Sequence, residues 1–189
     1  MIQSGKFDSS NMDIKKLANS VLIFVIRRLI EISGIFVLCL GVLLLIALIS
    51  YSPTDPNFIF PENTEIKNLL GFQGSYIADI FFQSIGLIAY LIPITYVFTG
   101  VNLFKKKQTF LIIENTFFIT LYSLVGSSFF AFYYKDTFIL YSNGNGGFVG
   151  DYLNQIFYKN LIISYDDIFY YFFIILISIL FLISINFNI

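Results

Sequence analysis

Hydrophobic residues are gathered into four long stretches that contain no charged side chain. The stretches run over residues 32–54, 80–104, 115–134 and 168–189, and each is rich in Ile, Leu, Phe and Val. A hydrocarbon core about 30 Å thick is crossed by ~20 helical residues that rise ~1.5 Å each. The pattern therefore predicts an all-α polytopic membrane protein whose four transmembrane helices span residues 32–50, 80–104, 115–134 and 168–189.

Two shorter apolar stretches do not reach this length. Leu17 to Ile26 lies between the pairs Lys15-Lys16 and Arg27-Arg28, so it either extends the first helix inward or lies along the membrane surface. The second stretch, residues 137–150, is interrupted by a run of Ser, Asn and Gly over residues 142–147. Such a turn would leave backbone groups unsatisfied in hydrocarbon, and we expect it outside the bilayer core.

The basic residues predict the orientation in the membrane. Eight of the 11 lie before the first span or between the second and third spans. Because basic residues are retained on the cytoplasmic side, segments 1–31 and 105–114 are expected inside. Segments 51–79 and 135–167 are then two outward-facing loops, and both chain ends are cytoplasmic.

Composition and motifs exclude most enzymatic chemistry. The chain has no His and a single cysteine, Cys39, so His-based catalysis and clusters of Cys and His that bind metal are excluded. The only Gly-Lys pair, Gly5-Lys6, is not preceded by the glycine of a phosphate-binding loop. With a net charge of −1, nothing suggests nucleic-acid binding. We expect no catalytic residue, no cofactor and no metal in this chain.

Small residues indicate faces where helices pack closely. Gly34 and Gly41 are about two turns apart and share a face of the first helix. Ser123, Ser127 and Ala131 form a similar row in the third span. Small residues let membrane helices approach each other, either between subunits or within one four-helix bundle.

Polar residues inside the spans are few. No Asp, Glu, Lys or Arg occupies the centre of a span, which argues against an ion-coupled transporter or channel subunit. The neutral residues Gln83, Thr95, Thr99 and Asn102 keep that alternative open. Pro93, half-way along the second span, is expected to kink its helix.

Prolines and an acid mark the exit from the first helix. Pro53 and Pro56 cannot continue a helix, so the first helix should end near Ser50. Asp55 can cap the turn between them.

The entry to the second helix has its own local features. Gly71 and Gly74 allow tight backbone geometry as the chain returns to the membrane. Asp79 should lie near the outer end of the helix, where a carboxylate complements the positive end of the dipole. This structural role is preferred to a role in binding a partner.

These segments resemble a known family. Ser50 to Asp79 contains S-x-S-P-x-D-P and N-L-x-G-x-x-G-x-x-x-A-D patterns, and Gly146 to Leu153 contains G-G-x-x-G-x-x-L. In this order and spacing they resemble the N-terminal four-helix membrane domain of the FtsK/SpoIIIE family of DNA translocases. The matching residues are Pro53, Asp55, Pro56, Asn68, Gly71, Gly74, Ala78, Asp79, Gly86, Tyr90, Pro93, Gly146, Gly147 and Gly150.

The resemblance implies a membrane anchor at the division septum, in the bacterial inner (cytoplasmic) membrane. Such an anchor contacts other cell-division membrane proteins and couples chromosome segregation to cell division. In the family, a hexameric motor that uses ATP and Mg follows the fourth helix, so a homo-oligomer through the motor is expected. Since no basic residue follows the fourth span, we expect the chain to be the membrane part of a longer protein. A membrane scaffold without a motor is the remaining alternative.

Overall fold

The computed structural model describes residues 4–56, 65–134, 144–158 and 166–186. Parts of both predicted outer loops, including Ser142 and Asn143, and the end of the fourth predicted span lie outside these residues. Within the described ranges the chain forms helices and no strand. The α-helices are α1 (Ser4–Ile49), α2 (Gly71–Ile85), α3 (Leu91–Lys106), α4 (Phe110–Tyr133), α5 (Gly147–Leu153) and α7 (Asp166–Ser184), with a 3-10 helix η1 (Gly86–Tyr90) and a π-helical turn η2 (Asn154–Tyr158).

The predicted fold class is confirmed. Four helical stretches are long and apolar enough to cross a membrane, at Lys16–Ile49, Gly71–Lys106, Phe110–Tyr133 and Asp167–Ser184. The side of the membrane that each end faces stays a prediction.

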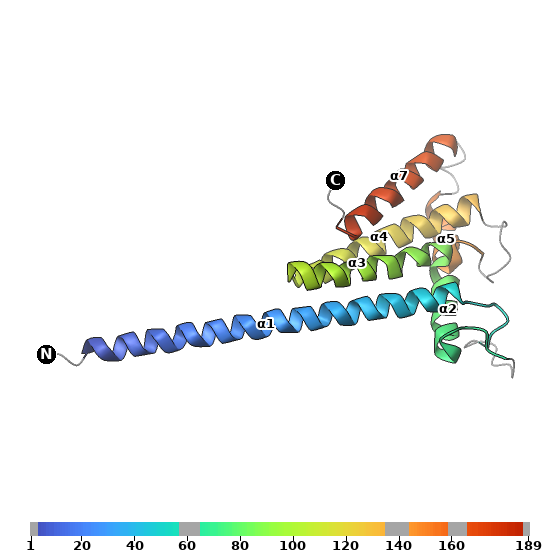
Figure 1. Ribbon diagram of the computed structural model, residues 1–189. Coiled ribbons are helices and arrows are strands. Elements are labelled where there is room, and N and C mark those ends of the chain that lie inside the picture. The colour runs from blue at the N-terminus through green and yellow to red at the C-terminus, as the bar shows by residue number, and fades with distance from the viewer. Residues whose placement is uncertain (1–3, 57–64, 135–143, 159–165, 187–189) are drawn as a thin grey trace.

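The crossing helices are arranged side by side (Figure 1). Helix α3 packs against α1 and α4, and α7 packs against α4. We call the end with Lys105 the basic end, and the end with α2 and α5 the junction end. Helix α7 runs from the junction end toward the basic end, the same end at which α1 begins.

Helix α1 is much longer than a bilayer crossing. Its 46 residues correspond to ~69 Å, against about 30 Å of hydrocarbon. The apolar stretch from Leu17 to Ile26 continues this helix, so of the two alternatives the structure shows the extension. The helix ends at Ile49, just before the two prolines.

The second crossing is not the single helix over 80–104 that the hydropathy pattern predicts. Helix α2 begins at Gly71 and lies across the end of α1, and η1 connects it to α3 (Figure 1). The helix is interrupted at Gly86, whose φ is +71°, in the left-handed region that favours glycine. The expected kink at Pro93 is wrong: Pro93 lies in the first turn of α3, where a missing N–H leaves no intrahelical bond unmade.

Candidate functional site: the junction of the helix ends

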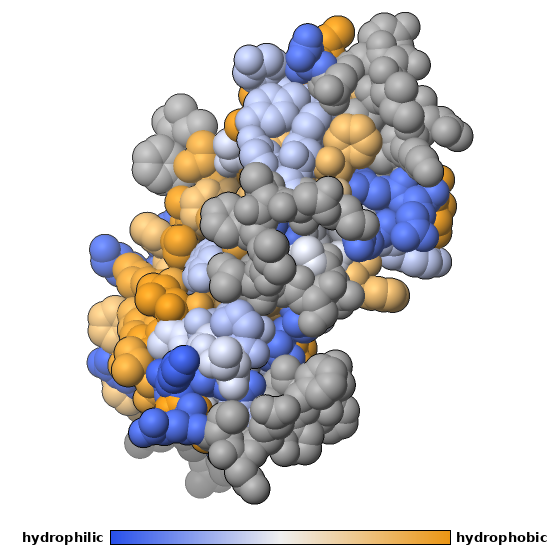
Figure 2. Space-filling model, turned by 90° about the vertical axis from the view of Figure 1, so that its right-hand side faces the viewer, coloured by the Kyte–Doolittle hydropathy of each residue, from blue (hydrophilic) through white to orange (hydrophobic). Residues whose placement is uncertain are grey.

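Most of the family-motif residues lie at the junction end. We call the contacts around Asp55, Asn68, Asp79, Gly86 and Asn145 the junction. Figure 2 looks onto this end, where hydrophilic residues lie among hydrophobic ones. The junction is best followed from the segment that leaves α1.

Asp55 binds the backbone that leads into α2. Its side chain is only 4% exposed, and its two oxygens accept hydrogen bonds from the amides of Lys67 and Asn68, each at 2.9 Å. The expected cap of the local proline turn is therefore wrong, because both carboxylate oxygens are directed to residues more than ten positions later. Asp55 connects the segment that follows α1 to the segment that precedes α2.

Asn68 satisfies backbone groups of both helices. Its side-chain nitrogen donates a hydrogen bond to the Ala47 carbonyl at 2.8 Å, and its side-chain oxygen accepts one from the backbone amide of Leu70 at 3.0 Å. Carbonyls in the last turn of a helix lack an intrahelical partner, so Asn68 supplies one to α1. A Cβ on Gly74 would overlap the Asn68 side chain, which explains the glycine at this position in the first turn of α2.

Asp79 lies in the middle of α2, not at its end. Its predicted interaction with the helix dipole is therefore wrong. The side chain is 5% exposed and accepts a hydrogen bond from the Tyr51 hydroxyl at 2.9 Å. The Tyr51 ring packs against Phe82 at a centroid distance of 4.9 Å, and Phe82 packs against Tyr90 at 5.2 Å. Asp79 thus joins α2 to the residues that follow α1.

The glycine-rich segment after α4 completes the junction. The Asn145 carbonyl accepts a hydrogen bond from the Leu87 amide at 2.9 Å, and its side chain donates to the Tyr134 carbonyl at 2.6 Å. A Cβ on Gly86 would overlap the Asn145 carbonyl. Gly86 therefore provides both the turn from α2 into η1 and the space for the incoming loop.

Two further motif glycines also pack within the chain. Gly147 has a φ of +64°, and a Cβ there would lie 2.7 Å from the Gly86 nitrogen. A Cβ on Gly150 would overlap the Ser127 carbonyl. The Ser127 hydroxyl donates to the Ile85 carbonyl at 2.9 Å, so the small face of α4 is occupied by α5 and the end of α2.

Gly34 and Gly41 face α3 in the same chain. A Cβ on Gly34 would lie 2.9 Å from the Gly100 carbonyl oxygen, and one on Gly41 would lie 2.9 Å from the Val97 nitrogen. Both glycines are buried, so of the two alternatives the structure shows packing within the bundle. Gly100, which sequence reasoning missed, contributes to the close approach from α3.

The neutral polar residues of the spans bond to one another inside the bundle. The Asn115 amide donates to the Thr99 hydroxyl at 2.8 Å and, at 3.3 Å, to the side-chain oxygen of Asn186. Asn102 donates to the Ile185 carbonyl at 3.2 Å. These contacts join α3, α4 and the end of α7. Their polar groups are used between helices, which is a structural use rather than an ion pathway.

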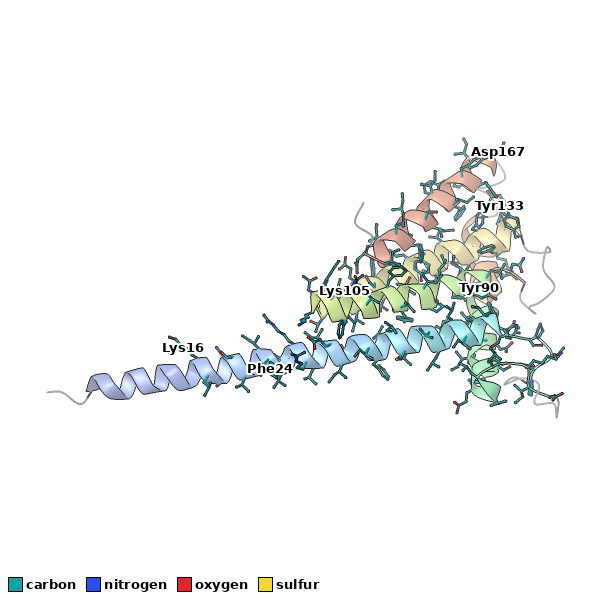
Figure 3. All side chains as sticks on the ribbon, in the orientation of Figure 1. Lys16, Phe24, Tyr90, Lys105, Tyr133 and Asp167 are labelled. Carbon is teal, nitrogen blue, oxygen red and sulfur yellow. The ribbon has the colours of Figure 1, made fainter. Side chains whose placement is uncertain are left out.

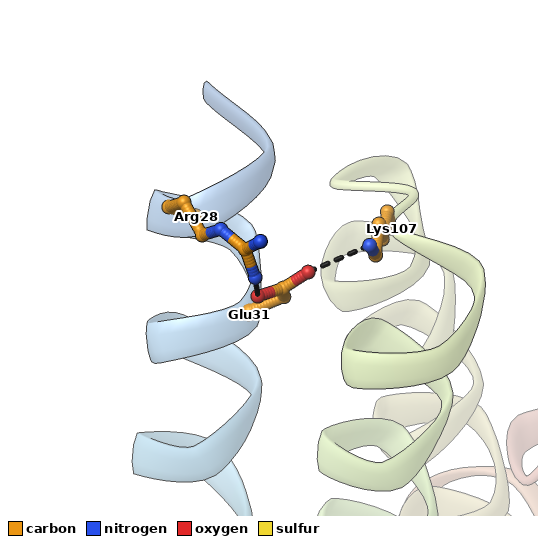
Figure 4. A network of polar contacts seen from close by, with 3 residues as sticks. All are labelled: Arg28, Glu31 and Lys107. Atoms are coloured by element: carbon orange, nitrogen blue, oxygen red, sulfur yellow. Dashed lines mark hydrogen bonds and ion pairs between the residues drawn. The ribbon is translucent and has the colours of Figure 1, made fainter. Parts of the chain in front are cut away.

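A charged contact joins α1 to α3 at the basic end (Figure 4). The Glu31 carboxylate pairs with Arg28 at 2.5 Å on its own helix and with Lys107 at 2.6 Å. Lys107 has a φ of +55° and ends α3. Sequence reasoning missed this contact, although the position of Glu31 beside the predicted boundary at residue 32 is a signal for it.

The chemistry of the junction is that of a structural connection. Within the described residues, no group of three acidic, Cys or His side chains is placed to hold a metal ion. Asp55 and Asp79 each accept hydrogen bonds from the protein itself. Gly86, Gly147 and Gly150 are placed where backbones approach each other closely. The motif residues therefore set how α1, α2, η1 and α5 meet.

Comparison with known proteins agrees with this arrangement. Residues 26–188 match the family described as the 4TM region of DNA translocase FtsK/SpoIIIE. The chain is similar to proteins named DNA translocase FtsK: 33% identical over 69% of its length to that of Shewanella oneidensis, and 30% identical over 62% to that of Rickettsia typhi. These matches cover 15% and 16% of the two relatives. No solved structure is similar to the chain. With four helices long and apolar enough to cross a membrane and a family match over residues 26–188, the chain belongs to the FtsK/SpoIIIE family through its 4TM region.

Proposed function

We propose that this chain is the membrane-anchor and septal-interaction domain of a bacterial DNA translocase, in the inner membrane at the division septum. It contacts other cell-division membrane proteins and couples chromosome segregation to cell division. The chain spans about one sixth of the relatives it matches. The motor, with its ATP, Mg and duplex DNA, belongs to the remainder of such a protein, and the chain itself carries out no catalysis.

One observation carries this proposal. The four crossings bring the beginning of α1 and the end of α7 toward the same end of the bundle, beside Lys105 (Figure 3). Basic residues are retained in the cytoplasm, so both chain ends are cytoplasmic and the junction is outside. A motor attached after α7 is then on the same side of the membrane as DNA. The network of Asn102, Asn115 and Asn186 fixes the end of α7 to α3 and α4, which suits an attachment point.

Localisation tests the septal role. The chain fused at its C-terminus to a fluorescent protein should form a ring at midcell in dividing cells. A matched control carries Asp55→Ala together with Asn68→Ala, which should disturb the junction while leaving the four apolar spans in place. Uniform membrane fluorescence from the unaltered chain would contradict the proposal.

Accessibility tests the topology. With Cys39 replaced by Ser, a cysteine placed at Asn63 or Asn143 should react with a membrane-impermeant maleimide in intact cells. A cysteine at Lys106 should react only after the cells are opened. Labelling at Lys106 in intact cells would reverse the assigned orientation.

A further inference from the structure

A cavity of about 580 Å³ lies between α1, α2 and α3 near the junction end. Its volume is within the range of about 300–1,000 Å³ that ligand pockets have. We call it the α1–α2 pocket. Helix α1 lines it with one face, whose residues are spaced by three and four positions: Val37, Leu40, Leu44 and Ala47.

Helix α2 closes the pocket toward the junction end. It crosses the end of α1 and continues past it on the side away from α3 (Figure 1). Its lining residues Gln73, Ile77 and Phe81 are four positions apart and lie on one face of α2. Since the lining residues of α1 all precede its end at Ile49, the pocket lies on the membrane side of α2.

The depth of the pocket corresponds to one leaflet of the bilayer. The charge pair of Glu31 and Lys107 marks the basic boundary, since charges are costly in hydrocarbon, and α1 ends at Ile49. Eighteen helical steps separate Glu31 from Ile49, about 27 Å, which matches a hydrocarbon core about 30 Å thick. Val37 and Ala47 are ten steps apart, about 15 Å, which is half of that thickness. The pocket therefore extends from the boundary at the junction end to about the middle of the bilayer.

The pocket is continuous with the surface of α1 that lipid covers. Leu40 and Leu43 line it and are each 47% exposed, and Ile77 on the α2 side is 42% exposed. At this depth exposed side chains meet acyl chains and not water. Water would find few hydrogen-bond partners among these apolar walls, so hydrocarbon is the solvent of the pocket.

The shape of the pocket favours a single acyl chain over a helix of a partner protein. A membrane-crossing helix is about 10–12 Å wide and needs ~20 residues to span the hydrocarbon. Such a helix, running along Leu40 and Leu44, would meet α2 before it reached the boundary. An acyl chain is thinner and flexible and ends within the bilayer, so it can enter from the side and lie below α2. There it contacts three helices instead of one, which increases the dispersion attraction.

Gln73 provides a polar contact for a lipid at the boundary. It lies on the lining face of α2 and is exposed. Within the described residues its side-chain amide forms no hydrogen bond. A polar group next to hydrocarbon is costly without a hydrogen-bond partner, and the ester carbonyls of a phospholipid lie at the edge of the hydrocarbon. The amide nitrogen of Gln73 can donate to one of these carbonyls while the acyl chain lies below α2.

We propose that the α1–α2 pocket binds one phospholipid of the leaflet on the junction side, with an acyl chain along α1 and an ester carbonyl at Gln73. The bound lipid fills the space between α1 and the part of α2 that continues past it, and so supports the angle between these helices. This inference depends on the membrane crossing of α1 and not on the septal role proposed above.

Native mass spectrometry of the chain in detergent tests the pocket. The unaltered chain should retain one molecule with the mass of a phospholipid. Leu40→Trp, which places an indole in the pocket, should reduce this retention about fivefold or more. The matched control is Val42→Trp, because Val42 is 40% exposed at nearly the same depth but lies outside the pocket lining. Its retention should equal that of the unaltered chain.

An ether analogue tests the contact at Gln73. After removal of the native lipid, phosphatidylethanolamine with ester-linked chains should bind the unaltered chain about two- to tenfold more tightly than its ether-linked analogue, the range for one hydrogen bond. Gln73→Leu should bind the two lipids equally, since it has no amide to donate.

The absence of Trp from the chain allows a test that keeps the pocket open. Leu43→Trp places a single Trp at the edge of the pocket. In detergent, added phosphatidylethanolamine with brominated acyl chains should quench its fluorescence to a plateau as the pocket fills. With Val42→Trp the quenching should rise only in proportion to the added lipid.

Four results would overturn the proposal. Equal lipid retention by Leu40→Trp and Val42→Trp would show that the lipid is bound elsewhere on the chain. Retention of a detergent or a free fatty acid in place of a phospholipid would show a different ligand. A photoreactive group at Leu43 that crosslinks to a protein in native membranes would show a partner helix in the pocket. Proportional quenching of Leu43→Trp would show no site, whether or not Leu40→Trp elutes as a folded, monodisperse protein.

Discussion

Replacement of Asp55 by alanine would leave two buried or partly buried backbone amides without an acceptor. The amides of Lys67 and Asn68 each donate to one carboxylate oxygen at 2.9 Å, and the Asp55 side chain is 4% exposed. A buried donor that loses its partner costs about 1–3 kcal/mol. The Asn68 amide is buried but the Lys67 amide only partly so, and water can replace part of the bond lost at Lys67. The expected loss in the free energy of unfolding is therefore about 1–4 kcal/mol.

Two other substitutions separate this cause from a change in charge. Asp55→Asn keeps one acceptor but presents an NH₂ group to the other amide, so it should recover no more than about half of the loss. Glu65→Ala removes an exposed carboxylate two positions before Lys67 and should change stability by less than about 0.5 kcal/mol. The free energy of unfolding can be measured by pulse proteolysis in mixed SDS and detergent micelles.

The reasoning fails if Asp55→Ala loses less than about 1 kcal/mol, because the buried amide of Asn68 alone should cost at least that much without an acceptor. It also fails if Glu65→Ala loses as much as Asp55→Ala. In that case the charge of the loop, and not acceptance of the two amides, would stabilise the junction.

Three further outcomes follow from the packing. Gly41→Leu should reduce the yield of folded monomer in detergent, since the leucine side chain would meet the α3 backbone. The control Val42→Leu, at an exposed position, should leave the yield unchanged. An unchanged yield of Gly41→Leu monomer with fewer oligomers would contradict the internal packing. Gly86→Ala should lower the free energy of unfolding by about 1–3 kcal/mol because alanine is strained in the left-handed backbone conformation. The overlap of its Cβ with Asn145 should lower it further. No change in the same micelle assay would refute this prediction. Asn115→Leu should cost about 0.6–2 kcal/mol, the range for interhelical hydrogen bonds in membranes, and should increase proteolysis after α7, while Thr116→Leu, near it on α4, serves as the control.

The sequence by itself determined the number of crossings and the end of α1. Charged side chains are costly in hydrocarbon, so long uncharged stretches identify the segments that can cross the membrane. Pro53 and Pro56 cannot continue a helix, and α1 ends at Ile49. Both inferences depend only on residues that are close together in the sequence, so they needed no knowledge of the fold.

The partners of the motif residues were decided only by the tertiary structure. Asp55 accepts hydrogen bonds from residues 12 and 13 positions later, and Asp79 binds Tyr51 across 28 positions. A local reading assigned each acid to the nearest turn or helix end and was wrong both times. Spacing does not show which distant amide or hydroxyl the fold brings within 3 Å.

The same limit explains the helix break and the packing of the glycines. Pro93 is the stronger local signal, but the helix is interrupted at Gly86, where the Asn145 carbonyl occupies the space of a Cβ. Gly34 and Gly41 could face a subunit or a neighbour in the chain on sequence alone. They face α3 because Gly100 provides a matching surface there, and close packing of two backbones is a property of the pair of helices, not of either one.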